Sequence, residues 1–494
     1  MIAAHLPALQ VVIPLLAAPT CVLLRHGRAA WLLAAAVTWT AFAISLGLLV
    51  EVAENGTISY AIGGWEPPWG IEYRVDLLSA FILVIVAGVG ALVMPFARIS
   101  VEREVPARRI YLFYVMYLLC LTGLLGIAIT GDAFNLFVFL EISSLSSYVL
   151  ISLGRDKRCL TAAFRYLIMG TIGATFYVIG VGLLYMMTGT LNMADLADRV
   201  PDLLHLRTID AALAFLIVGI SLKLALFPLH LWLPNAYAFA PTAVTVFLAA
   251  TATKVSVYAL IRIVFTVYGG LPIVADAAIN EVLMGLGMLS MIAAALVAIF
   301  QHNVKRLLAY SSVSQIGYMI LGLGLGNVVG LAGGMVHIFN HAIMKAVLFM
   351  AIGCAFTRAG AVDIEDLAGL GRRMPVTMAC LVVGAFSLIG VPLTVGFVSK
   401  WYLIQAALEI GAWPVAVVVL ASGLLAIVYT WRMVEAAYFR PAPAGMADGV
   451  DEAPLGMLVP MVVLAAACVA FGVDATWTMD LALAVADSLI GMAP

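Results

Sequence analysis

Residues 219–241 read GISLKLALFPLHLWLPNAYAFAP, and this stretch decides the fold. It places Lys223 inside a hydrophobic run and Pro228 five residues further along the chain. Proline removes a backbone hydrogen bond and therefore kinks or breaks a helix. A broken membrane helix is tolerated where it lines a cavity inside the protein, and such breaks are where transporters bind ions. His230 follows two residues after the proline, so the stretch predicts an interrupted membrane helix beside an ion path.

The rest of the chain has the same hydrophobic character from one end to the other. Of its 494 residues, 64% are hydrophobic and only 11% are charged, whereas soluble domains carry roughly 25% charged residues. A helix needs about 20 apolar residues to cross a bilayer core, so we predict an all-α integral membrane protein with about 14 transmembrane helices. The predicted spans are 4–24, 29–51, 75–97, 110–130, 133–153, 164–188, 211–232, 241–263, 279–300, 305–325, 327–357, 376–400, 413–437 and 455–474.

Basic residues are divided unevenly between the loops on the two sides. Cytoplasmic loops of membrane proteins are enriched in Lys and Arg. The loops after spans 1, 3, 5, 9, 11 and 13 hold 17 of the 25 Lys and Arg residues. The opposite loops hold four, which are Arg74, Arg199, Arg207 and Arg262. We therefore predict that both termini lie on the non-cytoplasmic side. The net charge of −2 argues against a nucleic-acid partner.

The remaining four basic residues lie within or at the edge of predicted spans, and all four are lysines. They are Lys223, Lys254, Lys345 and Lys400. The chain has 19 arginines and only six lysines, so composition alone does not explain this sorting. Arginine stays protonated in proteins, whereas a buried lysine can release its proton. The sorting indicates that these amines gain and lose protons when the protein works.

Glu141, within FNLFVFLEISSLSSYVL (134–150), is the only carboxylate near the middle of a predicted span. A charge at the bilayer centre costs about 2.5–3.5 kcal/mol on insertion scales, so Glu141 must face the protein interior. We expect a switchable pair with Lys223, whose attraction at roughly 4 Å is about 4 kcal/mol at an effective dielectric of about 20. The alternative is a protonated glutamic acid that only positions helices.

Three further titratable residues, His337, His341 and Lys345, occur in VHIFNHAIMKAVLF (336–349). Their spacing of four places them on one face of one helix, about 6 Å apart along its axis. With water between them, such a row is a proton wire. The alternative is that the histidines are satisfied core groups. A rival from another class is a haem-binding redox protein, but haem ligation normally requires histidines on two facing helices.

Lys400 lies in FSLIGVPLTVGFVSKWYL (386–403), where Gly390 and Pro392 interrupt a second span. The interrupted seventh and twelfth spans are five spans apart, and an odd number of spans turns a second copy upside down. We therefore predict two inverted five-helix repeats. The predicted units are 1–109 with an external hairpin near 52–74, 110–263 and 279–440 as the repeats, and 441–494 as a linker and the last span.

The chain has no glycine-rich phosphate loop, no Cys/His metal cluster and no hydrolytic triad. We therefore predict no cofactor and no metal, and a transporter subunit in preference to an enzyme. Because many apolar faces occur without a soluble domain, we expect lateral docking against lipid and other membrane subunits.

Five segments together resemble a known family, the antiporter-like subunits shared by Mrp-type cation/proton antiporters, respiratory complex I and membrane-bound hydrogenases. The segments are GDAFNLFVFLEISSLSSYVL (131–150), SLKLALFPLHLWLPNAY (221–237), HNVKRLLAYSSVSQIGYMILGLG (302–324), HIFNHAIMKAVLFMAIG (337–353) and GVPLTVGFVSKW (390–401). The resemblance covers nearly the whole chain and implies 14 helices with inverted repeats at spans 4–8 and 9–13. By the family motif, the functional residues are the fifth-span Glu141, seventh-span Lys223, eighth-span Lys254, eleventh-span His337, His341 and Lys345, and twelfth-span Lys400.

Within this family the chain is most similar to the D-type chains of Mrp antiporters, through its length and the Thr-Lys-Val at 253–255. Asn303 and Asn235 depart from the family pattern, because many relatives carry aspartate there, but neither is a conducting position.

We therefore predict a proton-translocating subunit of a multi-subunit Na⁺/H⁺ antiporter in a prokaryotic plasma membrane. Protons would pass through the lysines and histidines named above, including His230, and Na⁺ is a further candidate ion. The alternative is a proton-pumping subunit of a complex I-like NADH-quinone oxidoreductase or membrane-bound hydrogenase, in which case the chain is a translocase subunit. Whether Na⁺ crosses this chain or a neighbour stays open.

Overall fold

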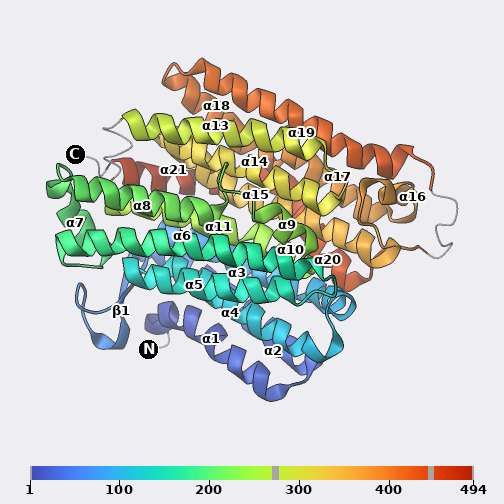
Figure 1. Cartoon of the computed structure of the whole chain (residues 1–494), viewed down its shortest axis with the longest axis horizontal. Coiled ribbons are helices and arrows are strands. Elements are labelled where there is room, and N and C mark those ends of the chain that lie inside the picture. Colours follow the sequence, from blue (N-terminus) through green and yellow to red (C-terminus); the bar gives the residue numbers. More distant parts are fainter. Residues whose placement is uncertain (1–2, 270–276, 443–449, 492–494) are drawn as a thin grey trace.

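The protein is a bundle of long helices that run roughly along its longest axis (Figure 1). The computed structural model describes residues 3–269, 277–442 and 450–491. Within these ranges, 12 helices are long and apolar enough to cross a membrane. The chain is thus a predominantly helical membrane protein, as its composition predicts.

The N-terminal half begins with six long helices, joined by short connections and one hairpin. Their bounds are α1 Leu6–Leu24, α2 Gly27–Asn55, α3 Leu77–Glu104, α4 Ile110–Ile129, α5 Ala133–Ser152 and α6 Arg158–Thr188. Shorter elements follow: α7 Met193–Leu203, α8 Arg207–Leu224, α9 Leu233–Phe239, α10 Thr242–Ala250, α11 Ala252–Ile261 and the π-helix η4 Arg262–Val267.

The C-terminal half has the same mixture of continuous and interrupted helices. Its elements are α13 Ala277–Ile299, α14 Val304–Gly324, α15 Val328–Ala359, α16 Leu370–Arg373, α17 Pro375–Ile389, α18 Val395–Glu409, α19 Trp413–Phe439, α20 Leu455–Val473 and α21 Thr476–Ile490. Helix α21 is an addition that the sequence interpretation missed, because that interpretation ended its last span at residue 474. Residues 443–449 of the predicted linker lie outside the described ranges.

Several helices begin at a polar side chain that accepts a hydrogen bond from the first turn. The capping residues are Asp76 for α3, Asp132 for α5, Asn192 for α7, Asn303 for α14 and Asn327 for α15. Short side chains with an oxygen acceptor are preferred there because the first backbone amides of a helix have no partner within it. The Asn303 side chain accepts this hydrogen bond as an aspartate would, so asparagine can replace the aspartate that many relatives carry at this position.

Both helix interruptions predicted at prolines are present. Helix α8 ends at Leu224, and Pro228 lies in the turn before α9. Helix α17 ends at Ile389, and Pro392 lies in the turn before α18. In each turn a non-glycine residue takes a left-handed backbone conformation, with φ of 61° at Ala225 and 68° at Leu393. This conformation is unfavourable for residues with a Cβ, so surrounding contacts must hold both turns in place.

A third interruption, at Thr251 between α10 and α11, was not predicted because no proline or glycine marks it. The carbonyl oxygens just before the break have partners outside the helix. The Tyr237 hydroxyl donates to Leu248 O at 3.2 Å, and the Lys254 ammonium donates to Ala249 O. Side chains that replace backbone amides as donors in this way interrupt a helix without proline.

Helix α15 occupies the middle of the bundle (Figure 1). It packs against α3, α10, α14, α17, α18, α20 and α21. Residues 330–355 of this helix are all buried. A helix that is buried on every side presents each polar side chain to other protein groups, so this helix is well placed to carry an internal polar row.

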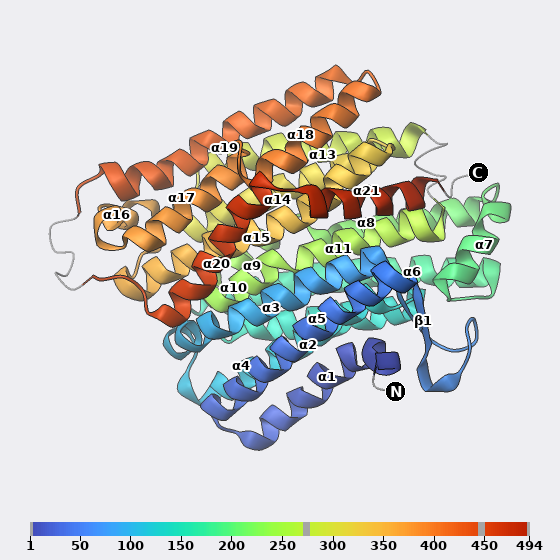
Figure 2. The ribbon, with the colours of Figure 1, turned by 180° about the vertical axis from the view of Figure 1, so that it is seen from behind.

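The hairpin forms where the sequence predicts it, with strand β1 Ile58–Ala61 antiparallel to β2 Glu72–Val75. The hairpin, α7, the start of α1 and the end of α21 all lie at one end of the bundle in both views (Figures 1 and 2). We call this the termini end. The short helix α16 lies at the opposite end.

Candidate functional site

Glu141 and Lys223 form the ion pair that the sequence predicts. The Lys223 ammonium lies 2.9 Å from Glu141 Oε1 and donates a second bond of 2.8 Å to the Ser144 hydroxyl. The Lys223 side chain is 4% exposed, whereas that of Glu141 is 23% exposed. Three neighbouring serines, Ser143, Ser146 and Ser147, instead bond to carbonyl oxygens of their own helix.

Close packing of α6 against α8 holds Lys223 in this position. A Cβ on Gly219 would lie 2.7 Å from Gly173 O, and a Cβ on Gly173 would lie 3.6 Å from the Lys223 side chain. Small residues allow membrane helices to approach this closely. The sequence contains both glycines, but only the packed helices show that they face each other.

A small internal cavity beside Lys223 extends toward α11. Its volume is about 10 Å³, and Ser144, Ser147, Lys223 and Ser256 contribute to its lining. A polar cavity of roughly 10–15 Å³ holds about one water molecule. Ser256 brings α11 into the lining, so the cavity connects the ion pair with one face of the helix that also carries Lys254.

Lys254 is 1% exposed and lies at the break between α10 and α11. Its ammonium donates to the Ala249 carbonyl and, at 3.4 Å, to the Thr253 hydroxyl. The end of α10 leaves carbonyl oxygens without helical partners and carries the negative end of the helix dipole. In the described ranges Lys254 has no carboxylate partner, so this helix end supplies its stabilisation.

Lys400 is held in the same manner by the end of α17. Its ammonium donates to Leu388 O at 2.9 Å and to Ile389 O at 2.8 Å, and it lies 4.8 Å from the centre of the Tyr318 ring. Gly390, with a φ of 92°, leaves space for the lysine, because a Cβ there would lie 2.9 Å from Lys400 Cδ. The break in the twelfth predicted span thus supplies the carbonyl oxygens that bond to Lys400.

The predicted row on α15 is present and fully buried. The rings of His337 and His341 are parallel within 4° with centres 6.1 Å apart. Lys345 continues the row and donates to Leu308 O at 2.9 Å and to the Ser311 hydroxyl at 2.5 Å. The row therefore runs along one face of the helix, as its spacing predicts.

The same row connects to the lysines at the two helix breaks. His337 Nδ1 lies 2.8 Å from the Ser399 hydroxyl, next to Lys400 in sequence, and Tyr318 lies against both His337 and Lys400. Lys254 lies near enough for its charge to act on both His337 and His341. The structure thus brings together five of the predicted residues in the centre of the protein.

Several buried imidazole nitrogens have no protein partner in the part of the chain that the structure describes. They are both ring nitrogens of His341, Nε2 of His337 and Nδ1 of His230. Buried polar atoms of this kind are normally satisfied by internal water. The α15 row therefore has the hydrogen-bonding capacity that a water-filled proton path requires.

His230 lies apart from the row, in the turn between α8 and α9. Its ring stacks on Phe227 with centres 5.1 Å apart and lies 6.1 Å from the Tyr310 ring. No hydrogen bond joins it to any of the buried lysines among the described residues. Among the described residues, His230 is thus less closely connected to the buried lysines than the other predicted residues are.

One polar cluster was missed by the sequence interpretation, which placed Arg262 in an external loop. Arg262 is instead buried at the start of η4, where its guanidinium bonds to Asp76. It also donates to the hydroxyls of Ser79 and Tyr258, both at 2.9 Å. Its spacing of eight from Lys254 was the available signal, because it places both residues on one helix face.

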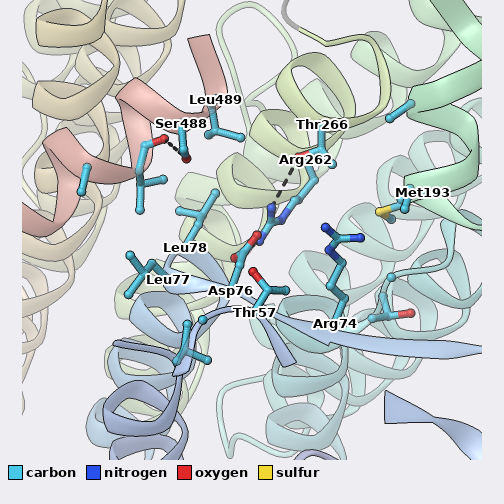
Figure 3. A pocket seen from close by; sticks show the side chains of 18 of the residues that line it. Thr57, Arg74, Asp76, Leu77, Leu78, Met193, Arg262, Thr266, Ser488 and Leu489 are labelled. Atoms are coloured by element: carbon cyan, nitrogen blue, oxygen red, sulfur yellow. Dashed lines mark hydrogen bonds and ion pairs between the residues drawn. The ribbon is translucent and has the colours of Figure 1, made fainter. Parts of the chain in front are cut away.

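The Asp76–Arg262 pair contributes to the lining of a cavity of about 590 Å³ at the termini end. Figure 3 shows the two side chains meeting in this cavity, with Arg74 alongside and with α21 residues Ser488 and Leu489 across from them. The cavity is partly open and lies away from the buried lysines.

A second missed pair lies at the opposite end of α3. The Lys305 ammonium lies 3.7 Å from Glu104 Oε2, and the same carboxylate accepts bonds from the backbone amide and hydroxyl of Thr242 at 2.9 and 3.0 Å. Glu104 therefore caps the start of α10, where a carboxylate is favoured by the helix dipole. The positive-charge count places Lys305 in a loop, whereas the structure buries it beside Glu104.

Known proteins are similar to this chain in sequence. Residues 130–426 match the family described as NADH:quinone oxidoreductase/Mrp antiporter, TM. The NADH-quinone oxidoreductase N-type chain of Desulforudis audaxviator is 42% identical over 487 residues, which cover 95% of this chain and 96% of that protein. The D-type chain of the Na⁺/H⁺ antiporter of Alkalihalophilus pseudofirmus is 33% identical over 453 residues, which cover 90% and 89%.

Two solved structures have the same fold over nearly the full length. A chain of the Mrp complex from Dietzia sp. DQ12-45-1b superposes with a TM-score of 0.91 at 25% identity, covering 100% of this chain and 98% of that one. A chain of the membrane-bound sulfane sulfur reductase, an archaeal respiratory membrane complex, has a TM-score of 0.89 at 32% identity and covers 99% and 98%.

Proposed function

Because this chain belongs to the NADH:quinone oxidoreductase/Mrp antiporter transmembrane family, we propose that it is a proton-translocating subunit of a multi-subunit Na⁺/H⁺ antiporter. The observation that carries this proposal is the Glu141–Lys223 ion pair, whose lysine is buried beside a broken membrane helix. A buried charge pair costs desolvation energy and is weak evidence of a stabilising role, whereas intramembrane ionisable residues typically mark ion and proton pathways.

Protons pass through the centre of the protein in a relay. A proton leaves Lys223 through the small cavity that reaches α11 and continues through internal water to Lys254 on that helix, and Lys254 exchanges protons with His341 and His337. His337 leads to Lys400 by way of Ser399 and internal water. Lys345 is a side branch that holds a proton beside His341. His230, in the turn between α8 and α9, is an additional proton site.

Glu141 controls the relay through its contact with Lys223. When the carboxylate is close, it favours the charged ammonium, and when it moves away, the lysine releases its proton inward. The pair attraction of about 4 kcal/mol compares with about 2.3 kcal/mol for moving one charge through 100 mV. A membrane potential of ordinary size is therefore sufficient to bias the switch.

The architecture behind this relay is 14 spans with two inverted five-helix repeats, 110–263 and 279–440. This count adds the two segments interrupted at prolines, α8–α9 and α17–α18, to the 12 spans that are long and apolar enough among the described residues. Each proposed repeat places a buried lysine next to its break, Lys223 in the first and Lys400 in the second. The symmetry would give each repeat a half-channel to one side of the membrane.

Partner subunits are expected against the outer face of α5. Phe134, Val138, Leu145 and Val149 are exposed there and lie on one stripe with Glu141. The Glu141 carboxylate is partly exposed in the middle of this stripe. Lipid cannot solvate a carboxylate, so another membrane subunit of the same complex covers it. The Mrp complex and the sulfane sulfur reductase, both multi-component assemblies, contain chains of this fold.

The complex lies in a prokaryotic plasma membrane, and both termini lie on the non-cytoplasmic side. The support for this orientation is the sequence count, in which 17 basic residues lie in the alternate loops of the predicted cytoplasmic side. Arg262 and Lys305 are buried, and removing both from the count leaves 16 against three.

A second function is favoured by one observation. The relative that is 42% identical is named as a chain of NADH-quinone oxidoreductase, and it is closer in sequence than the antiporter chain at 33%. In that case the same relay is a proton pump driven by a redox reaction. Purifying the complex with its neighbours distinguishes the two, because quinone reduction by NADH accompanies only the second.

The test of the proposed function uses the whole complex in membrane vesicles and replaces Lys223 by alanine. We expect Lys223→Ala or Glu141→Ala to abolish Na⁺-driven proton movement, measured by a pH-sensitive dye, while the chain still inserts. Lys157→Ala is the matched control, because Lys157 is exposed in a loop. Full antiport by Lys223→Ala would remove the ion pair from the mechanism.

A further inference from the structure

A second row of polar side chains extends from Lys254 toward the termini end. Lys254 and Tyr258 lie on α11, and Arg262 begins η4, so the three residues follow a spacing of four. Residues at this spacing share one helix face and are about 6 Å apart along the axis. The row joins the centre of the protein to the cavity described above.

The Tyr258 hydroxyl is surrounded by partners. It donates to Ala128 O at 2.8 Å, accepts from Arg262 Nε at 2.9 Å and lies 3.1 Å from the Ser79 hydroxyl. A phenol oxygen has one hydrogen to donate and two lone pairs to accept with. Three protein groups thus surround the phenol oxygen, and Arg262 occupies a lone pair that a water molecule would need.

The cavity ends at the ion pair. Asp76, Arg262 and Thr266 contribute to its lining, whereas Tyr258 and Lys254 do not. The side chain of Asp76 is 27% exposed and that of Arg262 is 9% exposed, so the carboxylate faces the cavity and the guanidinium lies behind it (Figure 3). The guanidinium therefore separates the cavity from the inner part of the row.

We propose that this cavity is an aqueous port that connects the termini end of the protein to Lys254, and that the Asp76–Arg262 pair, together with Tyr258, is its gate. The proposal rests on the proposed function, since it assigns a role within the same proton relay.

The gate opens when the Arg262 guanidinium swings toward the cavity without leaving Asp76. A lone pair of Tyr258 is then free to accept a hydrogen bond from water. A proton that leaves Lys254 passes through water to the Tyr258 oxygen. The phenol hydrogen breaks its hydrogen bond to Ala128 O and passes to water in the cavity, which carries the proton away. Tyr258 ends the step as a neutral phenol, and Lys254 ends it as a neutral amine. Because arginine keeps its proton, Arg262 blocks or clears the path without carrying protons.

The first experiment measures access to position 254 in the intact complex. Lys254→Cys is the reporter, and a membrane-impermeant cationic thiol reagent is added from the termini side. The six native cysteines are all buried, and the chain without the reporter gives their background. We expect the reporter to react at least ten times faster when Asp76→Ala and Arg262→Ala are combined with it.

The matched control for that experiment is Asp198→Ala, because Asp198 also contributes to the cavity lining but is exposed on α7. It should leave the reporter's reaction rate unchanged. Equal rates with and without the Asp76–Arg262 pair, or reaction from the opposite side only, would overturn the proposal.

A second experiment covers the case in which the double alanine variant fails to fold. Tyr258→Phe keeps the ring and removes only the hydroxyl, so we expect antiport at least tenfold slower at a normal protein level. Tyr268→Phe is its control, because the Tyr268 hydroxyl likewise donates to a buried carbonyl, Ile209 O at 3.1 Å, but lies off the row. Equal loss in both variants, or no loss in Tyr258→Phe, contradicts the gate.

The outcomes separate the port from the proposed function. If Lys223→Ala retains antiport, the relay itself fails. If Lys223→Ala abolishes antiport while Tyr258→Phe transports normally and the gate variants leave position 254 unreactive, the relay stands and only the port is rejected.

Discussion

Lys254, Lys345 and Lys400 are bonded to backbone carbonyls and hydroxyls, whereas Lys223 alone among the four central lysines has a carboxylate within the described residues. The difference has a chemical consequence. A neutral amine still has two hydrogens to donate to carbonyl oxygens, so those contacts survive loss of the proton. An ion pair loses its Coulomb attraction at the same moment. The three carbonyl-bound lysines are thus suited to pass protons, and Lys223 is suited to be switched.

This distinction predicts that Lys400→Arg stops transport although the positive charge is kept. Arginine cannot release its proton in a protein, so a relay site that must become neutral is lost. We expect antiport in vesicles to fall at least tenfold at an unchanged protein level. Lys157→Arg, in the exposed loop, should have no effect. Transport at the normal rate in Lys400→Arg would show that a fixed charge is sufficient at this position.

At the scale of elements, the broken helices make the lysine sites. The ends of α10 and α17 each present carbonyl oxygens that have lost their helical partners, and a lysine from the following helix occupies each end. The break at the end of α8 differs, because the Trp232 indole donates to Leu222 O at 2.9 Å. Lys223, at that helix end, is consequently left to bond with α5.

The turn between α17 and α18 predicts a cost for Gly390→Ala. A left-handed backbone costs a residue with a Cβ roughly 1–2 kcal/mol, and here the Cβ would also displace Lys400. We expect a lower melting temperature of the purified complex and at least tenfold slower antiport. Gly182→Ala is the control, because a Cβ there meets nothing within 4 Å. An unchanged melting temperature and rate in Gly390→Ala would contradict the role of the turn.

At the scale of the whole molecule, α3 bonds to both ends of the α10–α11–η4 segment. Glu104, its last residue, caps α10, and Asp76, just before its first residue, pairs with Arg262. The segment is therefore fixed at its two ends while its break at Thr251 lies between them, next to Lys254. We therefore expect movement in the segment at the break and at the gate residues of the termini end.

The exposed face of α5 makes a prediction about assembly. A photoactivatable crosslinker attached at Leu145→Cys, which is 52% exposed beside Glu141, should join this chain to another subunit of the complex. The same reagent at Leu32→Cys, 60% exposed on α2 with no carboxylate within one helical turn, is the comparison. The products are identified by gel shift and mass spectrometry. If Leu145→Cys yields only lipid adducts, no subunit covers Glu141.

Much of this architecture follows from local properties of the sequence. The length of each apolar run sets most of the spans, and the prolines at 228 and 392 set two of the breaks, because proline acts on its own backbone wherever it lies. The spacing of His337, His341 and Lys345 determined their common face. The Glu141–Lys223 pair also followed, since isolated charges at membrane depth require each other.

Only the tertiary structure decided the break at Thr251, the carbonyl partners of Lys254 and Lys400, and the Asp76–Arg262 pair. Each depends on groups that packing brings together. The break at Thr251 depends on the contact of Tyr237 with Leu248 O, and the two lysine sites depend on the shape of the helix ends that receive them. The Asp76–Arg262 pair joins segments that are more than 180 residues apart in the sequence. Hydrophobic patterning specifies which residues enter the membrane, but the interior partner of a polar atom is chosen by how the helices pack.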